Sequence, residues 1–304
     1  MTVKFYKQPK LKKPDLLVGW PGIGNIGIIT VDTLRSRLRA EEMGEIEPWD
    51  FFYPTKVRIK DGVLDDLEFP RNKFYYKRLK DKDLMFFIGE EQPSGRGKTY
   101  AEGGKAYEMA NLVLDVAEKF GCRRVYTSGA AVALTHHMVP PRVWAVATTR
   151  DLVNEARNYV NTVLMSEVEG RGNEGNITGL NGLLIGVAKK RGLEGICLMG
   201  EIPDYLSRVP FPYPKASKSV LEVLEIILGV SIDFGNLDDM AAQMENVIEN
   251  VYNQFPQEIR ERIEQRKLDI QDKRGIITKD DEEWIKEHID EFFEKEDRGE
   301  ERTA

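Results

Sequence analysis

The stretch "DLLVGWPGIGNIG", residues 15–27, decides the fold class of this chain. It opens as an apolar run typical of a buried strand and continues into three glycines, Gly22, Gly24 and Gly27, spaced G-x-G-x-x-G. A segment with helical periodicity follows at 25–38. A strand, a glycine turn and a helix in this order begin a strand–helix–strand unit, so the stretch predicts an α/β domain.

The remainder of the first 235 residues repeats this alternation. Further strand-like runs lie at 51–59, 74–78, 84–90, 124–128, 143–148 and 195–201. Further helix-like segments lie at 100–120, 181–191 and 215–228. The alternation predicts a mostly parallel sheet flanked by helices. The Asp61-Gly62 pair additionally predicts a β-hairpin inserted in that pattern.

From Asn236 onward the sequence shows helical patterns without strands between them. We therefore predict an α/β core domain over 1–235 and a helical C-terminal extension over 236–304. The extension ends in an acidic amphipathic helix whose apolar residues are candidates for partner binding: Trp284, Ile285, Ile289, Phe292 and Phe293. Packing on the chain itself or on another copy is favoured, and docking on a foreign, basic protein remains the alternative.

Composition and charge exclude several classes of protein. The 304 residues include only two cysteines, and no apolar run reaches the roughly 20 residues that span a bilayer. Residues 279–302 hold twelve acidic and five basic residues, which accounts for the whole net charge of −7. This balance argues against nucleic acid or an anionic membrane as partner. The cysteine usage predicts a reducing, cytoplasmic location, and the Lys/Glu-rich composition hints at a thermophile.

The glycine spacing by itself would suggest a dinucleotide site at Gly22, Gly24 and Gly27. Such a site needs an acid about 20 residues further on, at the end of the second strand. Here Glu45 and Glu47 precede the next apolar run, "WDFFY", so they would lie at the wrong end of that strand. We therefore expect an architectural turn, with glycines that allow the helix to pack on the sheet.

A second loop, "GEEQPSGRGKTYAEGG" at 89–104, ends Gly97-Lys98-Thr99 like a phosphate-binding loop. Gln92 stands where the first glycine of such a loop belongs, and Glu90 and Glu91 would place negative charge beside the phosphates. We expect no cofactor. The alternative left open is a nucleotide- or nucleoside-binding enzyme that uses the 22–27 and 95–99 loops, with Lys98 and Thr99 as binding residues.

No catalytic or metal-binding set converges in the sequence. Ser128 lacks the surroundings of a nucleophile elbow, and His136 and His137 are expected to be partly exposed beyond a strand end. Three histidines and two cysteines cannot supply a metal shell here, so we expect no metal. The proline-rich segment 203–214 instead predicts a rigid surface for a partner, with Tyr205, Phe211 and Tyr213 as its aromatic residues.

Five segments in order carry a resemblance to a known family: "LLVGWPGIGNIG", "FIGEEQPSG", "VYTSGAAVA", "ITGLNGLLIGVAKKRGLEGICLMGEIP" and "YPKASKSVLEVLEIILGVSID". Through them the chain resembles the proteasome assembly chaperone 2 family over most of residues 15–233. The resemblance implies an α/β fold like that of nucleoside phosphorylases, without an established active site.

The resemblance also implies a function without catalysis: helping proteasome subunits to assemble. The expected partners are copies of this chain in a ring (a trimer or pentamer), a second family member, or proteasome subunits. Family members that dock on the proteasome end in a hydrophobic residue, a tyrosine and any residue. This chain ends Arg302-Thr303-Ala304, with threonine at the tyrosine position, so that route is not carried over to it.

Overall fold

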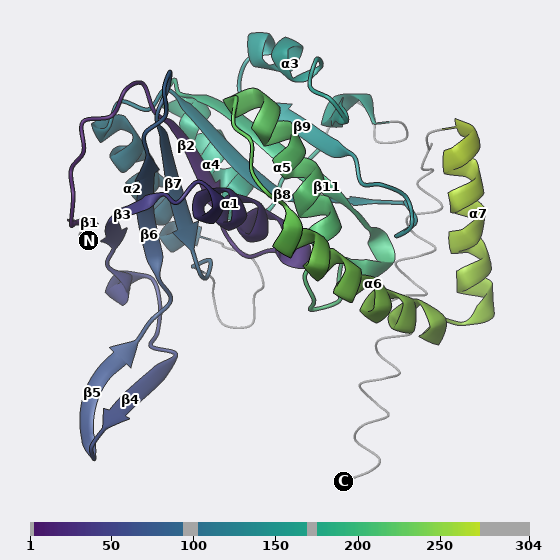
Figure 1. Ribbon diagram of the computed structural model, residues 1–304, viewed down its shortest axis with the longest axis horizontal. Helices are drawn as coiled ribbons and strands as arrows, with labels where there is room; N and C mark the ends of the chain where they lie inside the picture. Colours follow the sequence, from purple (N-terminus) through teal and green to yellow (C-terminus); the bar gives the residue numbers. More distant parts are fainter. Residues whose placement is uncertain (1–2, 94–102, 169–174, 274–304) are drawn as a thin grey trace.

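The computed structural model describes residues 3–93, 103–168 and 175–273 (Figure 1). Its strands are β1 (Val3–Phe5), β2 (Asp15–Gly19), β3 (Glu41–Ile46), β4 (Lys56–Lys60), β5 (Val63–Glu68), β6 (Asn72–Lys77), β7 (Leu84–Gly89), β8 (Arg124–Ala133), β9 (Val143–Ala147), β10 (Thr162–Leu164) and β11 (Glu194–Pro203). Its α-helices are α1 (Ile26–Arg37), α2 (Gly103–Lys119), α3 (Arg150–Ala156), α4 (Gly179–Lys190), α5 (Pro214–Leu228), α6 (Gly235–Gln254) and α7 (Gln257–Lys273).

One sheet organises the molecule, in the order β1-β3-β6-β7-β2-β8-β11-β9-β10. Its centre, β7-β2-β8-β11, is parallel, as the strand–helix alternation predicts. Antiparallel pairs extend this centre: β1-β3-β6-β7 on one side and β11-β9 on the other. The sheet is therefore mixed, with the glycine-turn strand β2 in the middle of its parallel part.

Helices cover both faces of this sheet (Figure 1). Leu16 and Val18 of β2 point to the face covered by α2 and α4, whereas Leu17 points to the face covered by α1 and α5. This alternation follows from the two-residue period of a strand, and it leaves every residue of β2 buried. Strands buried on both faces are typical of parallel sheets with helical crossovers.

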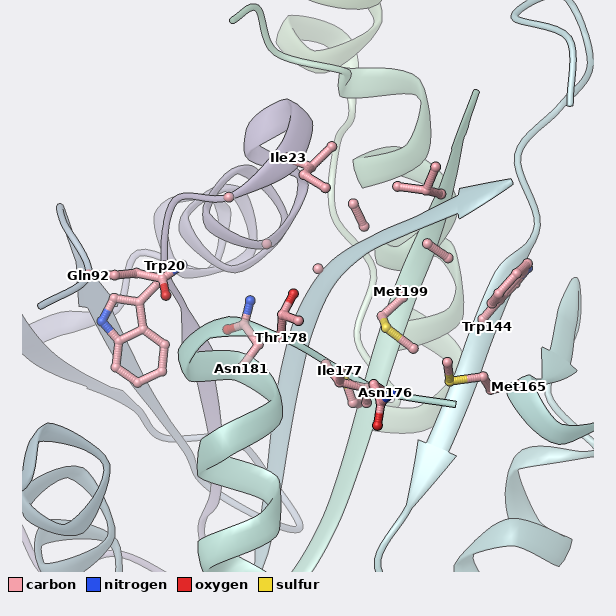
Figure 2. A pocket seen from close by; sticks show the side chains of 17 residues that line it. Trp20, Ile23, Gln92, Trp144, Met165, Asn176, Ile177, Thr178, Asn181 and Met199 are labelled. Atoms are coloured by element: carbon pink, nitrogen blue, oxygen red, sulfur yellow. The ribbon is translucent and has the colours of Figure 1, made fainter. Parts of the chain in front are cut away.

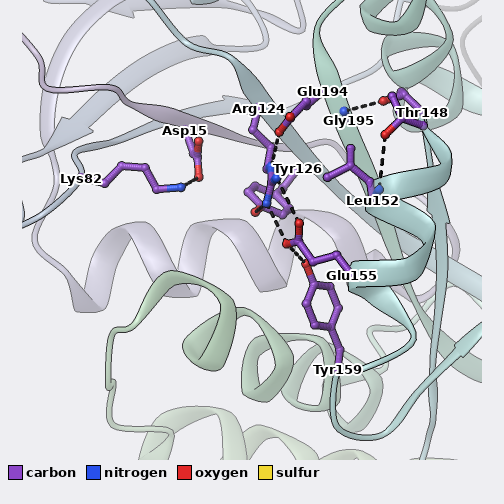
Figure 3. Close-up of polar contacts among 11 residues, drawn as sticks. Asp15, Lys82, Arg124, Tyr126, Thr148, Leu152, Glu155, Tyr159, Glu194 and Gly195 are labelled. Atoms are coloured by element: carbon purple, nitrogen blue, oxygen red, sulfur yellow. Dashed lines mark hydrogen bonds and ion pairs between the residues drawn. The ribbon is translucent and has the colours of Figure 1, made fainter.

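Charged residues gather where the central parallel strands begin (Figure 3). The Arg124 guanidinium, at the start of β8, makes two hydrogen bonds to the Glu155 carboxylate of α3, at 2.8 and 3.1 Å. Its Nε donates to Glu194 at the start of β11 at 2.7 Å. At the start of β2, Lys82 pairs with the buried carboxylate of Asp15. Burial raises the pKa of Asp15 and the Lys82 ammonium opposes that rise. At this edge of the sheet the charged side chains therefore pair with one another.

One expected strand is shorter in the structure, and β1, β3, β10 and α3 were not predicted. The predicted strand 51–59 is a strand only from Lys56, because residues 48–50 form a 3₁₀ turn ahead of it. The segment 41–46 forms the unpredicted strand β3. The hairpin is confirmed: β4 and β5 pair across Asp61 and Gly62, whose φ angles of 51° and 80° suit its tight turn.

The chain after α5 is helical as far as the structure describes it. Helix α6 begins at Gly235, next to the expected boundary, and Ile259 and Ile263 of α7 are buried in the same hydrophobic cluster as Ile202 of β11. The division into two domains, the nucleoside-phosphorylase-like label and the acidic end of the extension stay predictions. The expected partner residues Trp284, Ile285, Ile289, Phe292 and Phe293 lie outside the described residues.

Candidate functional site

The glycine turn runs from the end of β2 to the start of α1 and is held in an unusual backbone conformation. Gly24 has a φ of 58° and the next residue, Asn25, a φ of 50°, both in the left-handed region that favours glycine. The Tyr213 backbone N–H donates to the Gly24 carbonyl oxygen at 2.8 Å. The turn is therefore tied to the segment that precedes α5.

Protein atoms occupy the space beside two of the three fingerprint glycines. A Cβ on Gly27 would lie 2.3 Å from the Ser128 carbonyl oxygen of β8, and one on Gly24 would lie 2.9 Å from the Tyr213 Cβ. Gly22 has open space instead. Gly24 and Gly27 thus permit close packing of the turn and α1 on β8 and the Tyr213 segment, which is the architectural role expected from the sequence.

A cavity of about 190 Å³ lies beside this turn, at the carboxyl ends of the parallel strands (Figure 2). It is lined by the glycine turn, the strands β8, β9 and β11, and the start of α4, with Trp20, Trp144, Thr178 and Asn181 contributing side chains. None of its lining residues in the described part of the chain is Lys, Arg, Asp, Glu or His. Its volume is below the roughly 300 Å³ at which small-molecule sites begin.

Two residues that line this cavity, Gln92 and Trp144, are held by hydrogen bonds. The Gln92 amide donates to the Pro21 carbonyl oxygen, and its own carbonyl accepts the Leu180 backbone N–H at 3.0 Å, so Gln92 ties the glycine turn to the start of α4. The Trp144 indole N–H donates to the buried Glu201 carboxylate at 2.7 Å, and Arg142 Nε donates to the same oxygen at 2.9 Å. Gln92 and Trp144 are thus hydrogen-bonded, whereas two other lining residues, Trp20 and Asn181, have buried polar atoms (Nε1 and Oδ1) without a hydrogen-bond partner in the described part of the chain.

The acids that a dinucleotide site would use lie far from the turn. Glu45 lies inside β3 and Glu47 directly follows it, so the expectation that both acids precede the second strand was wrong. Strands β6 and β7 separate β3 from β2 in the sheet. The other candidates for a cofactor, Lys98 and Thr99, lie outside the described residues.

A second cluster forms where α6 and α7 pack on the body. His136 and His137 follow β8 and their rings stack with centroids 4.2 Å apart. His136 Nε2 lies 3.3 Å from the Glu264 carboxylate of α7, and His137 Nε2 lies 3.4 Å from that of Glu249 in α6. The expectation of partly exposed histidines was wrong, since both are buried. The helices that cover them come from more than a hundred residues away, so no local pattern reveals this burial.

The aromatic residues predicted to face a partner lie mostly inside the same region. Tyr205 and Tyr213 are fully buried, which corrects their assignment to an exposed surface, and Phe211 is half-buried. The Tyr205 hydroxyl lies 2.7 Å from His137 Nδ1, and its ring meets that of Phe255 edge-on. The C-terminal helices therefore pack on the proline-rich segment.

The described cluster contains one buried ion pair that fixes α7. Arg266 of α7 donates to the Asp204 carboxylate, just past β11, at 2.9 Å, and both side chains are largely buried. Burial raises the pKa of Asp204, and the Arg266 charge opposes that rise. Sequence reasoning did not pair these residues because 62 positions separate them.

The histidine pair makes the stability of this region depend on pH. Burial lowers the pKa of His136 to about 4 and also lowers that of His137. Glu264 and Lys267 of α7, Glu249 of α6 and Lys215 of α5 face the pair. A histidine whose pKa is lower in the folded state costs no stability above its unfolded pKa, about 6.5, and costs more as pH falls below it.

We expect the melting temperature to drop as pH falls from 7 to 5, and to drop less in His136→Asn. The asparagine cannot take up a proton, and its side-chain oxygen can still accept the Met138 backbone N–H that His136 accepts at 3.1 Å. Differential scanning calorimetry across this range measures both slopes. Equal slopes for wild type and variant would show that His136 does not carry the effect.

The chain matches one family model, described as the PAC2 family, over residues 16–251. The chain belongs to the PAC2 family. This confirms the resemblance drawn from the sequence. The region that matches the PAC2 model extends from the glycine-turn strand β2 into α6, so it includes the cavity and both His136 and His137.

Individual relatives agree with this assignment. Among solved structures, the PAC2-family chain is similar to Pyrococcus furiosus PbaB, an archaeal proteasome activator, with 29% identity and a TM-score of 0.68. That match covers 82% of this chain and 98% of PbaB. Pyrococcus furiosus PbaA, an archaeal homolog of proteasome-assembly chaperone, shares the fold at 20% identity and a TM-score of 0.59, covering 87% and 98% of the two chains. An uncharacterized protein of Methanocaldococcus jannaschii is 28% identical over 78% of this chain and 82% of its own length.

Proposed function

We propose that this PAC2-family chain is a non-catalytic chaperone of proteasome assembly that acts as a homo-oligomeric scaffold. The observation that carries the proposal is the similarity to PbaB, which spans 98% of that protein at 29% identity. A likeness of that extent relates the whole PbaB fold to this chain. Similarity in a single motif would not support this inference.

The chemistry of the glycine-turn region supports a role without catalysis. Gly24 and Gly27 face protein atoms at close range, and the adjacent cavity of about 190 Å³ has no charged lining residue in the described part of the chain. Acid–base catalysis needs a titratable group within reach of the substrate. Cys197 is the lining residue that can titrate, and burial raises its pKa to about 11, so it stays a neutral thiol near pH 7.

The finer features of the sequence analysis belong to this proposal. The scaffold would be a ring of three or five copies, working in the cytoplasm with proteasome subunits or a second family member. The core 1–235 would supply the ring, and the stripe at 284–293 would add a contact between copies. No described helix is long and apolar enough to cross a membrane.

Two measurements on the full chain test the proposal. Size-exclusion chromatography with light scattering should give a mass that is a multiple of 34.8 kDa. Purified archaeal proteasome α subunits should co-elute with the chain, while an unrelated acidic protein of similar size should not. A monomer that leaves the α subunits behind would overturn both the scaffold and the chaperone.

A further inference from the structure

A hollow of about 720 Å³ lies at the root of the β4–β5 hairpin. The hairpin is a separate two-stranded sheet and projects from the body at one end of the molecule (Figure 1). The hollow lies between this hairpin, residues 45–49 at the end of β3, and residues 69–72 at the start of β6. Its volume falls within the range of ligand-binding clefts.

Carboxylates are in excess among the side chains that line the hollow. Within the described residues the lining holds five carboxylates and three cations. One of the five, Asp66, shares the Arg58 guanidinium with Asp65. The other four make no ion pair with any residue in the described part of the chain: Glu45, Glu47, Glu68 and Glu90. The hollow is therefore a site of uncompensated negative charge.

The three cations of the lining do not cancel this charge. Arg58 Nε lies 2.8 Å from the Asp65 carboxylate, and the Lys4 ammonium lies over the Tyr6 ring, 5.5 Å from its centroid. The third cation, Arg71, donates its backbone N–H to the Glu90 carboxylate at 2.9 Å. A cleft in which one sign of charge prevails concentrates ions of the opposite sign. The hollow therefore attracts cationic groups.

An exposed tryptophan lines the same hollow. Trp49 is 64% exposed, and its ring contacts that of Phe69 edge-on, with 4.6 Å between the centroids. Tryptophan is the aromatic side chain that attracts a cation most strongly. A guanidinium can stack on an aromatic ring while its N–H groups donate to carboxylates, whereas an ammonium acts as a point charge. Trp49 among carboxylates therefore fits an arginine side chain better than a lysine.

A buried hydrogen-bond acceptor also belongs to the lining. Asn72 is 1% exposed, and its side-chain amide donates to the Pro70 carbonyl oxygen at 3.2 Å. The Asn72 Oδ1 atom has no hydrogen-bond partner in the described part of the chain. Nearly all buried polar atoms in folded proteins have a partner, whether protein, water or a bound molecule. A ligand rich in N–H donors, as a guanidinium is, suits such a lining.

We propose that this hollow is a docking site for an arginine-bearing segment of a partner protein. The guanidinium stacks on Trp49 and donates to Glu47 and Glu68, which lie close in sequence to Trp49 and to its ring contact Phe69. The hairpin beside the hollow is exposed over all of β4 and all but the last residue of β5, so a polypeptide can leave the hollow along it. The inference goes beyond the scaffold function, because it requires neither a ring nor proteasome subunits.

Fluorescence anisotropy of a labelled hexa-arginine peptide, mixed with the full chain at low salt, tests the carboxylates. Glu47→Gln/Glu68→Gln should weaken binding at least tenfold. Glu222→Gln/Glu258→Gln is the matched control, because it removes the same charge from two exposed acids that do not line the hollow. Both variants keep the acidic residues 279–302, so any binding there is common to them. The control should bind like wild type, and unchanged melting would show that both variants fold. Equal binding by the first variant and wild type would overturn the proposal, as would an equal loss in the control.

Trp49→Ala tests the aromatic contact in the same assay and should weaken binding of the hexa-arginine peptide at least fivefold. Tyr53→Ala is the comparison, because Tyr53 is even more exposed, at 84%, but does not line the hollow. It should bind like wild type. A hexa-lysine peptide should bind wild type more weakly than hexa-arginine does, and equal affinities would overturn the choice of arginine. Equal loss in both aromatic variants, or no loss in Trp49→Ala, would contradict stacking on Trp49. A monomeric chain that binds the peptide would keep this site and end the scaffold.

Discussion

Gly27→Ala is expected to lower the free energy of unfolding by about 3 kcal/mol, the upper end of the range for inserting one methyl group into a packed region. The new Cβ would lie 2.3 Å from the Ser128 carbonyl oxygen and 3.2 Å from that of Trp20. Both are backbone atoms, so no side chain can rotate away to relieve the contact. Helix α1 would have to move off β8, which is a central strand of the sheet. Urea unfolding followed by circular dichroism measures the loss.

Gly22→Ala is the matched control in the same turn. No atom lies within 4 Å of a Cβ built on Gly22, and its φ of −172° is extended backbone that any residue adopts. We expect its midpoint of unfolding to differ little from wild type. If Gly27→Ala unfolded at the same urea concentration as Gly22→Ala, the turn would not be packed as described, and the space beside Gly27 would be open to a ligand.

Arg266→Ala is expected to release α7 from the body. The variant leaves the Asp204 carboxylate buried without its cation, and breaking a buried pair in this way typically costs about 3–5 kcal/mol. The free energy of docking α7 limits the loss, since the helix can detach while the sheet stays folded. Hydrogen exchange should therefore show lost protection in α7 and around His136 and Tyr205, with little change in β2 and β8.

Lys218→Ala provides the comparison for a surface pair. Lys218 lies 2.6 Å from the Asp238 carboxylate, but the two side chains are 34% and 51% exposed, and such surface pairs contribute about 0–1 kcal/mol. Its exchange pattern should match that of wild type. Unchanged protection of α7 in Arg266→Ala would mean that Ile259 and Ile263 hold the helix without the ion pair.

Local patterns predicted the centre of the fold because its strands are continuous apolar runs followed by periodic helices. Local patterns did not predict all of the strands outside this centre. Strand β3 reads "EEMGEI", and its acids and glycine hide the period-two pattern of a strand. Strand β8 extends to Ala133 although "GAAVA" has low strand propensity, because pairing with β11 along its whole length overrides that propensity.

In the candidate site, too, the sequence predicted some features and missed others. The glycines predicted an architectural turn from sequence, since left-handed φ angles and close packing are properties of glycine itself. The burial of Tyr205, Tyr213, His136 and His137 was missed. Each of them is covered by segments that are distant in the sequence. The residues next to it in the sequence give no indication of such a contact.

By itself, the sequence determined the α/β class, the hairpin, the helices after β11 and the family. Each of these follows from short-range periodicity, from turn residues or from a set of sequence segments in a fixed order. Only the tertiary structure decided which residues face solvent. Tyr205 and Tyr213, predicted to form an aromatic surface, are instead buried beneath the C-terminal helices. The aliphatic side chains of the β4–β5 hairpin are exposed. Burial depends on contacts between distant segments, and the folded chain alone brings those segments together.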